Sequence, residues 1–569
     1  MIYPTIFSVP RILAAHGVKH AIVAPGSRNA PLTLAFARNK DIGCHVIPDE
    51  RSAAFIALGM AQQTHRPVVL VCTSGSAALN FAPAVAEAFF SNVPLIVLTA
   101  DRPPEWIDQY DGQTIRQTAI FGQHVKLSLT TPADLTHNDA QWHLQRQINE
   151  AAIASLTPSP GPVHINFPFR EPIYPNADTT TGDLDIKIFR QAASSKKLSD
   201  NTTSQLKSDL ATFKRKLIVV GQGMYQPDVL QQLSTLSHEH YIPVVGDIIS
   251  NIHSMEEAVL HADVFLGSSK SGLHQSLQPD LLITFGKSIL AKNLKLMLRQ
   301  YQATEHWHIT IDGEAPDTYQ SLTRVIPADL PEFLTLVAES DQNPDFERQK
   351  QENYFHIWQI EERKVKRHLQ EFFPHDQWGE FEFIKTVIDS LPACNLHLAN
   401  SMTVRYANFI GTGNGNITVY CNRGTSGIDG SNSTAVGHAI TSDKLNVLIT
   451  GDLAFFYDRN AFWHHENYSN LRIILLNNHG GSIFRMIKGP ASQPELEEYF
   501  ETRQHLNARL LCEEFGFEYL LCDKKSKVKN YISRLLEDDG NPRLLEIETQ
   551  GDVNQQILDA FKAGFNELK

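Results

Sequence analysis

The sequence predicts an α/β protein built from three doubly wound parallel-sheet domains. Short, continuously apolar runs recur along the chain and alternate with helical patterns, which is typical of parallel strands buried on both faces. Polar, charged and small residues follow many of these runs, and ligands in open parallel sheets bind at the carboxyl ends of the strands. At 569 residues the chain is long enough for about three or four domains.

The first block, residues 1–180, is expected to contain a parallel sheet. Its strands are expected where Ala, Ile, Val and Leu dominate, and its helices where apolar residues recur at helical spacing. The strands are expected at 21–24, 45–47, 68–72 and 95–99, and the helices at 53–63 and 77–90. A polar stretch rich in Thr, Ser and Lys, residues 176–205, is expected to be a linker.

The second block, residues 205–340, is expected to form a central Rossmann-like sheet with strands at 217–220, 281–285 and 308–311. Gly221-Gln222-Gly223 follows its first strand, but Gln226 occupies the third glycine position of the dinucleotide fingerprint, which disfavours a nicotinamide or flavin site. A charged helical connector is expected at 346–372. The third block, residues 373–569, has expected strands at 417–420, 445–450, 471–476 and 544–547.

Composition indicates a large cytoplasmic enzyme. Hydrophobic residues make up 42% of the chain and charged residues 20%, both ordinary globular values. The net charge of −13 argues against nucleic acid as a partner, so an anionic substrate must meet locally placed cations. The six scattered cysteines form no Cys-x-x-Cys pair and are expected to be reduced. The start of the sequence has no signal pattern, and no apolar run reaches about 18 residues, so no membrane association is expected.

Two strand ends in the third block predict a metal-diphosphate site. Gly451-Asp452-Leu453 follows the strand at 445–450, and residues 477–481, Asn-Asn-His-Gly-Gly, follow the strand at 471–476 with a helical stretch expected between them. A carboxylate, an amide and free carbonyls at neighbouring strand ends can converge on Mg²⁺, which takes part of its oxygen shell from phosphates. Each half alone is more often an ordinary turn, but the two in this order favour the metal site.

This pair of motifs resembles the thiamin-diphosphate (ThDP) fingerprint, which opens with Gly-Asp-Gly and closes with Asn-Asn. Further runs extend the resemblance along the chain, namely residues 24–29 (APGSRN), 49–51 (DER), 99–104 (TADRPP) and 422–430 (NRGTSGIDG). Together they resemble the 2-succinyl-5-enolpyruvyl-6-hydroxy-3-cyclohexene-1-carboxylate synthase family of menaquinone biosynthesis, in which Gly-Asp-Leu is usual. The resemblance is specific in the first and third blocks and weak in the middle one.

The resemblance implies the fold of ThDP-dependent decarboxylases, with a pyrimidine-binding (PYR) domain at 1–180, a central domain at 205–340 and a diphosphate-binding (PP) domain at 373–569. It also implies a site formed between two subunits, in a homodimer or homotetramer. Glu50 would hydrogen-bond the aminopyrimidine and activate the cofactor, although an acid opposing a helix dipole is the ordinary reading of such a residue. Mg²⁺ or Mn²⁺ would be held by Asp452, Asn478 and the Gly480 carbonyl. The cofactor-binding set is Glu50, Ser74, Gly75, Ile428, Gly451, Asp452, Leu453 and Asn478.

The family decarboxylates 2-oxoglutarate and adds the resulting enamine to isochorismate, and arginine's planar fork suits the carboxylates of both substrates. By resemblance, the 2-oxoglutarate part is contacted by Ser401, Arg405 and Arg423. Isochorismate is contacted by Ser27, Arg28, Arg102, Gln113 and Lys292, with Lys287 as an alternative to Lys292. Ile483 and Phe484 would wall the reacting carbons. The pair His464-His465 is expected to be structural and to lie within a helix.

Three alternatives stay open from the sequence. Another ThDP enzyme, such as an acetohydroxyacid synthase or a simple 2-oxoacid decarboxylase, would not need the arginine set. A non-catalytic α/β regulatory protein would be expected to have lost Glu50 or Asp452. A nicotinamide-dependent oxidoreductase is disfavoured by Gln226.

Overall fold

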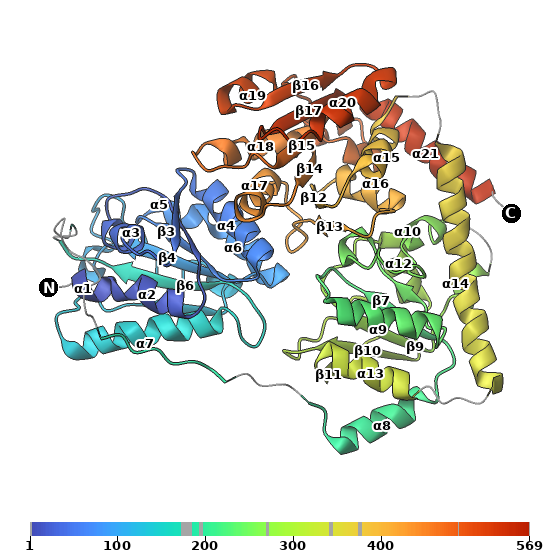
Figure 1. Ribbon diagram of the computed structural model, residues 1–569, viewed down its shortest axis with the longest axis horizontal. Coiled ribbons are helices and arrows are strands. Elements are labelled where there is room, and N and C mark those ends of the chain that lie inside the picture. The colour runs from blue at the N-terminus through green and yellow to red at the C-terminus, as the bar shows by residue number, and fades with distance from the viewer. Residues whose placement is uncertain are drawn as a thin grey trace.

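Three parallel sheets form the framework of the chain. The computed structural model describes residues 3–171, 174, 185–192, 197–268, 272–340, 345–373, 378–487 and 489–567. The strand orders are β2-β1-β3-β4-β6-β5, β11-β10-β9-β7-β8 and β13-β12-β14-β15-β17-β16, one sheet in each block. Every pairing between these strands is parallel. The predicted fold class is therefore confirmed (Figure 1).

The first sheet carries helices between its strands. Its strands are β1 (His20–Val23), β2 (Gly43–Val46), β3 (Val68–Cys72), β4 (Leu95–Asp101), β5 (Leu127–Thr130) and β6 (Val163–Pro168). Its helices are α1 (Tyr3–Ile6), α2 (Ser8–Ala15), α3 (Ala30–Ala37), α4 (Glu50–Thr64), α5 (Ser76–Asn80), α6 (Ala82–Ser91) and α7 (Asn138–Ala154). The prediction of a single helix at 77–90 is wrong, because the structure has two helices here, which are separated at Phe81. Pro83 has no N–H to continue the earlier helix and instead lies in the first turn of α6.

The predicted linker at 176–205 is only partly described. Residues 185–192 lie against α7, where the Asn149 amide donates to the Lys187 carbonyl at 2.9 Å. The predicted C-terminal end of the linker is wrong, because helix α8 (Asp200–Leu210) begins before residue 205. The Ser199 side chain accepts a hydrogen bond from the Thr202 N–H and so caps this helix.

The second sheet leads into a long connecting helix. Its strands are β7 (Lys216–Val220), β8 (Val244–Val245), β9 (Leu281–Phe285), β10 (Glu305–Thr310) and β11 (Arg324–Pro327). Its helices are α9 (Pro227–His238), α10 (Ala262–Phe265), α11 (Leu273–Ser276), α12 (Lys292–Gln300) and α13 (Leu330–Ser340). The charged connector is α14 (Asp345–Phe372), which runs beside α10 and the C-terminal helix (Figure 1). A buried ion pair of 2.7 Å between His261 and Glu362 joins it to the second block.

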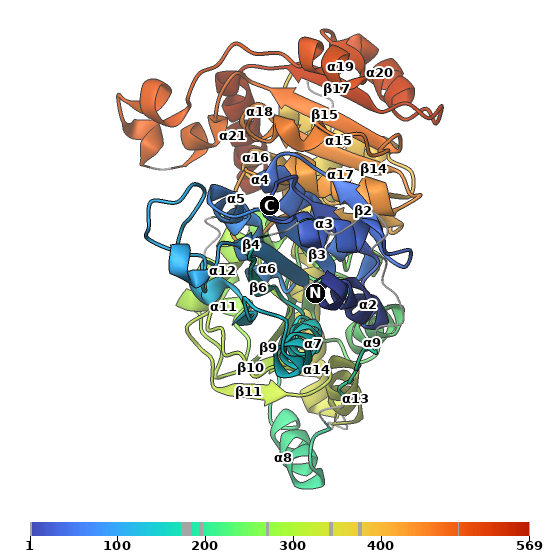
Figure 2. The ribbon, with the colours of Figure 1, turned by 90° about the vertical axis from the view of Figure 1, so that its left-hand side faces the viewer.

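The third sheet holds the motifs that predicted a metal site. Its strands are β12 (Cys394–Leu398), β13 (Ile417–Tyr420), β14 (Asn446–Gly451), β15 (Leu471–Asn477), β16 (Glu518–Cys522) and β17 (Arg543–Glu548). Its α-helices are α15 (Glu380–Ser390), α16 (Met402–Ile410), α17 (Ser431–Thr441), α18 (Asp452–Tyr457), α19 (Arg509–Phe515), α20 (Val528–Leu535) and α21 (Gly551–Glu567). In the view of Figure 2 this block lies at the top and α8 at the bottom. The domain boundaries at 1–180, 205–340 and 373–569 stay predictions.

The helix expected around His464 and His465 is absent from the described structure. A 3-10 helix, Arg459–Phe462, ends before them, and both histidines lie in irregular backbone. The His464 ring explains the break, because Nε2 bonds the Ala461 carbonyl at 2.9 Å and Nδ1 accepts from the Glu466 N–H at 3.1 Å. These local bonds compete with helical backbone bonding.

The first and third blocks share one hydrophobic core, in which α4 packs against α17 (Figure 1). Two glycines allow the helix backbones to touch. A β-carbon at Gly59 would lie 2.1 Å from the Thr434 carbonyl oxygen, and one at Gly437 would lie 2.1 Å from the Ile56 carbonyl oxygen. The contact therefore fixes the helix that begins at Glu50 against the block that carries Asp452.

The cysteines and the lengths of the helices bear on two further predictions. All six cysteines are free, and five of them are buried. Among the described residues, no helix combines the length and the apolar character that crossing a membrane requires.

Candidate active site

A cavity of about 370 Å³ lies at the carboxyl ends of the strands of the third sheet. Neighbouring parallel strands bring their following loops to the same edge, and the pairing of Gly451 with Leu476 sets the loops after β14 and β15 side by side. All the third-block residues that the sequence analysis selected line this cavity: Ser401, Arg405, Arg423, Ile428, Gly451, Asp452, Leu453, Asn478, Gly480, Ile483 and Phe484. No described residue of the first block is part of its lining.

Asp452 and Asn478 have the arrangement expected of metal ligands. Asp452 is 2% exposed, and its carboxylate accepts from the Leu453 N–H at 2.8 Å and the Gln504 amide at 2.7 Å. Burial raises the pKa of this carboxyl, and the hydrogen bonds that it accepts oppose the shift. The buried Asn478 Oδ1 has no hydrogen-bond partner among the described residues. An unpartnered acceptor beside a carboxylate fits a hard cation, which binds through oxygen.

Glu380 determines which way the Asn478 amide faces. Its Oε1 accepts from Asn478 Nδ2 at 2.7 Å and from the Thr549 hydroxyl at 3.2 Å, and Ser482 Oγ lies 3.1 Å from the same Nδ2. Both amide protons therefore have partners, and Oδ1 is left free to bind a cation. Burial raises the pKa of Glu380 to about 7. Sequence reasoning missed Glu380, because an acid at the start of a helix such as α15 is ordinary.

Two guanidinium groups face the same cavity. Arg405 lies on α16, and Arg423 lies in the loop after β13, where its Nη1 donates to Asn400 Oδ1 at 2.9 Å. Burial first, and then the neighbouring Arg423 charge, lowers the pKa of Arg405. The Arg423 Nε is buried and has no partner among the described residues. A pair of partly desolvated guanidinium groups is suited to a carboxylate ligand.

Lys292 and Lys287, the alternatives for contacting isochorismate, differ in their surroundings. Lys292 is exposed at the start of α12, and Lys287 forms a 3.0 Å ion pair with Glu314. Neither lines the 370 Å³ cavity. Lys295 lies on the same helix, α12; its pKa is lowered by burial and then by the positive charge of Arg423, and its Nζ donates to the Ile289 carbonyl at 2.8 Å.

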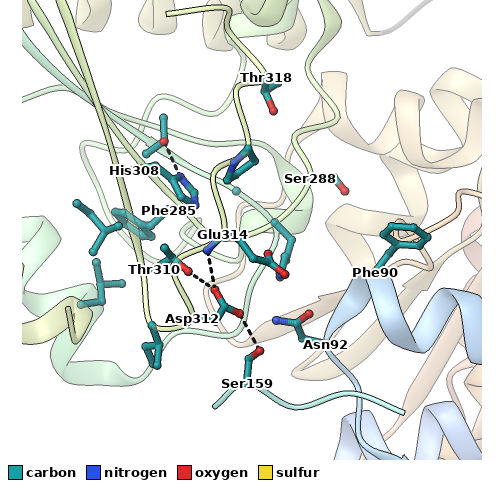
Figure 3. Close-up of a pocket in the computed structure, with 18 of the residues that line it drawn as sticks. Phe90, Asn92, Ser159, Phe285, Ser288, His308, Thr310, Asp312, Glu314 and Thr318 are labelled. Carbon is teal, nitrogen blue, oxygen red and sulfur yellow. Dashed lines mark hydrogen bonds and ion pairs between the residues drawn. The ribbon is translucent and has the colours of Figure 1, made fainter. Parts of the chain in front are cut away.

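A second cavity, of about 800 Å³, lies between the first and second blocks (Figure 3). Lys287, Arg423 and Gly424 are part of its lining. The carboxylate of Asp312 points into the cavity, but it accepts hydrogen bonds from the Thr310 and Ser159 hydroxyls (Figure 3). The Asp312 carboxylate and the two hydroxyls therefore already have hydrogen-bond partners within the protein.

The Gly221-Gln222-Gly223 turn is packed against protein. A β-carbon at Gly221 would lie 2.3 Å from the Lys287 carbonyl oxygen, so this glycine is required by the approach of the loop after β9. The Gln222 amide donates to the Cys421 carbonyl at 2.8 Å. Packing therefore accounts for the turn without a dinucleotide phosphate.

The first-block residues form a separate group at the carboxyl ends of β1, β2, β3 and β4. The loops after β1 and β3 are in contact, since a β-carbon at Gly26 would lie 2.3 Å from Thr73 Cβ. Gly75 lies beside the Gln113 backbone. The Arg102 guanidinium donates to the Gly112 carbonyl at 3.1 Å, so this side chain also lies beside the segment that contains Gln113. Ser74 Oγ is buried and has no partner among the described residues.

Glu50 and Arg28 complete this first-block group. Glu50 opens α4, which Asp49 caps by accepting from the Ser52 N–H at 3.0 Å. Burial and then the Glu50 charge raise the pKa of Cys72, the last residue of β3. Arg28, which follows Ser27, is 5% exposed and lies 3.1 Å from Glu171. Within one chain, the predicted residues of the first block form one group and those of the third block form another.

Comparison with known proteins gives a consistent result. Residues 8–120 match the family model "Thiamine pyrophosphate enzyme, N-terminal TPP binding domain", and residues 190–397 match "Middle domain of thiamine pyrophosphate". Curated proteins named 2-succinyl-5-enolpyruvyl-6-hydroxy-3-cyclohexene-1-carboxylate synthase are similar over almost the whole chain. The protein from Cytophaga hutchinsonii is 44% identical over 560 residues, 98% of each chain. Those from Flavobacterium johnsoniae and Christiangramia forsetii are 38% and 36% identical, over 100% of this chain and 100% and 99% of theirs.

Proposed function

The chain belongs to the family of 2-succinyl-5-enolpyruvyl-6-hydroxy-3-cyclohexene-1-carboxylate synthases, and from this premise we propose how its residues divide the reaction. It is a ThDP-dependent transferase of menaquinone biosynthesis. The succinyl group in the family name has the four carbons that 2-oxoglutarate retains after losing CO₂. The remaining ring and enolpyruvyl group correspond to isochorismate. These two acids are the proposed substrates.

The gathering of Arg405 and Arg423 with Asp452 and Asn478 around one cavity carries the proposal. The metal side of the cavity would hold the cofactor diphosphate, through Mg²⁺ or Mn²⁺ bound by Asp452, Asn478 and the Gly480 carbonyl. The two guanidinium groups would bind the distal carboxylate of 2-oxoglutarate, with Ser401 beside them. Ile483 and Phe484 would exclude water from the carbon that loses CO₂.

When bound, ThDP supplies a carbon nucleophile for the keto group and accepts the electrons that CO₂ leaves behind. Glu50 would hold a proton at N1′ of the aminopyrimidine, and Ser74 and Gly75 would line the same ring. Ile428, in the loop after β13, would support the cofactor from below. Isochorismate would be oriented so that its ring carbon β to the carboxylate meets the new nucleophile. The residues proposed to orient it are Ser27, Arg28, Arg102, Gln113 and Lys292.

A second copy of the chain would complete the site. Glu50 and most of the isochorismate residues lie on the first block, whereas the metal and 2-oxoglutarate groups line a cavity that is lined by no first-block residue from the described part of the same chain. The first block of each chain would face the third block of the other chain, so a dimer would contain two complete sites. A homodimer is therefore the minimum proposed assembly, and a homotetramer would contain two such pairs.

The arginines are expected to separate the two halves of the reaction. Replacing Arg405 or Arg423 by Ala should slow the release of the first CO₂ from 2-oxoglutarate, because the carboxylate loses a charge-assisted partner. Such a bond contributes about 1.5 to 3 kcal/mol, so the loss should be roughly ten- to a hundredfold. Replacing Arg28 or Arg102 should leave first-turnover CO₂ release normal and slow the transfer of the remaining four-carbon unit to isochorismate.

Single-turnover assays of CO₂ release measure the first step, and product formation after isochorismate is added measures the second. Arg324→Ala is the matched control, since its partners Asp209 and Trp307 both lie in the second block, and it should change neither step. Equal slowing of CO₂ release by Arg102→Ala and Arg423→Ala would contradict the division of roles. Failure of the unmodified enzyme to consume isochorismate would contradict the proposed function itself.

A further inference from the structure

The loop at residues 421–430, between β13 and α17, is held by all three blocks. It carries Arg423 and Ile428, both of which line the 370 Å³ cavity. From the second block, the Ser288 hydroxyl donates to the Arg423 carbonyl at 3.1 Å; Ser288 lies on the wall of the larger cavity (Figure 3). From the third block, the Asn400 amide donates to the Asn422 carbonyl at 2.8 Å and the Gly427 carbonyl at 2.7 Å.

Glu87 is the anchor that the first block contributes. It lies on α6 and is 0% exposed. Its Oε1 accepts from the Gly424 N–H at 2.8 Å, and its Oε2 accepts from the Thr425 N–H at 2.6 Å and the Thr425 hydroxyl at 2.8 Å. The Ser91 hydroxyl also donates to Oε1, at 2.7 Å. The carboxylate thus receives four hydrogen bonds, three of them from the loop.

The fit around Gly424 shows how closely the loop approaches α6. A β-carbon on Gly424 would lie 2.7 Å from the Glu87 carbonyl oxygen and 2.7 Å from Ser91 Oγ. The backbone next to Arg423 is therefore pressed against the helix and bonded to a side chain of that helix. A glutamine at position 87 would place an NH₂ group against one of these N–H donors, because only one of its two terminal atoms accepts.

Arg423 directly precedes the two residues that Glu87 holds. Its Nη1 bonds Asn400, but its buried Nε has no partner among the described residues. The fixed backbone at Gly424 and Thr425 therefore restricts where the guanidinium can lie. Neither group of residues selected from the sequence includes Glu87, since it stands within a helix and 336 positions separate it from Arg423.

We propose that Glu87 is a positioning residue for recognition of the 2-oxoacid, acting through the 421–430 loop to hold Arg423 toward the cavity. This inference rests on the proposed role of Arg423 in binding the substrate carboxylate. Glu87 acts within its own chain, whereas the Glu50 group of the same block would serve the second copy. The first block thus contributes to both sites of a dimer.

Glu87→Gln in the full-length holoenzyme tests the proposal. Amide hydrogen–deuterium exchange in a peptide covering residues 421–430 should rise, and KM for 2-oxoglutarate should rise about ten- to a hundredfold, as expected for loss of hydrogen bonds to a charged group. KM for isochorismate should stay within about twofold, since the residues proposed to bind it lie outside this loop. Asp317→Asn is the matched control, because that carboxylate also accepts from two successive N–H groups, Ser321 and Leu322, but on the surface of the second block.

The outcomes separate this proposal from the function on which it rests. Normal exchange and normal KM in Glu87→Gln, with a raised KM in Arg423→Ala, would overturn the role of Glu87 alone. A normal KM for 2-oxoglutarate in Arg423→Ala would overturn the assignment of Arg423 and with it the proposed function of the loop. Should Glu87→Gln fail to fold, Thr425→Val removes one of the same bonds. It should raise both readouts by a smaller factor, and unchanged readouts would contradict the proposal.

Discussion

Asp452→Ala is expected to abolish the metal-dependent binding of ThDP. The protein would hold the proposed metal by one carboxylate, one amide oxygen and one carbonyl, so the substitution removes the only anionic protein ligand. Glu380 cannot replace it, because its carboxylate accepts from Asn478 and Thr549. Calorimetric titration of the protein with ThDP, at fixed Mg²⁺ and without it, measures the effect. The affinity should fall to that seen without metal.

Gln504→Ala is the control for this prediction. Gln504 donates to Asp452 Oδ2 at 2.7 Å, so its removal disturbs the carboxylate and leaves the ligand in place. A much smaller loss of affinity is expected. Normal, Mg²⁺-dependent ThDP binding by Asp452→Ala would show that the metal is held elsewhere.

Glu50→Gln is expected to leave ThDP bound but inactive. Glutamine retains the size of the side chain and one hydrogen bond, yet it cannot share a proton with N1′ of the aminopyrimidine. Loss of a positioned acid-base group costs roughly 10² to 10⁴ in rate. Hydrogen–deuterium exchange at C2 of the bound cofactor, followed by rapid quench and NMR, should slow by that factor. An exchange rate close to that of the unmodified protein would remove Glu50 from this role.

The sheets were predictable where their strands are apolar along their whole length. β3, β9 and β13 occur at the predicted residues, and β7, β14 and β15 within one residue at either end. β12 was missed because Asn395 and His397 interrupt its apolar pattern. These polar groups are buried and bond the Asn446 side chain, which lies on the neighbouring strand β14. Their partners come from the tertiary structure, so the local sequence reads as irregular.

The selected residues of the third block came from short motifs at strand ends, and the parallel topology accounts for their meeting in one cavity. Glu380 and Glu87 could not be found in this way. Each acts on a motif residue that is distant in the sequence, at Asn478 and Gly424, and each is an acid on a helix, where a solvent-exposed position is the ordinary expectation. Only the packed fold shows that both carboxylates are buried and what they bond.

Mixing two inactive variants tests most directly whether each active site is shared between two chains. Glu50→Gln and Asp452→Ala chains, each inactive alone, are dissociated, mixed and reassembled, and synthase activity is measured. In a mixed dimer with shared sites, one site carries both substitutions and the other carries neither, so activity should return toward about half of the normal value per mixed dimer. If each chain builds its own site, every site carries one substitution. Mixed dimers, verified by mass spectrometry, that stay as inactive as the parent variants would contradict the account.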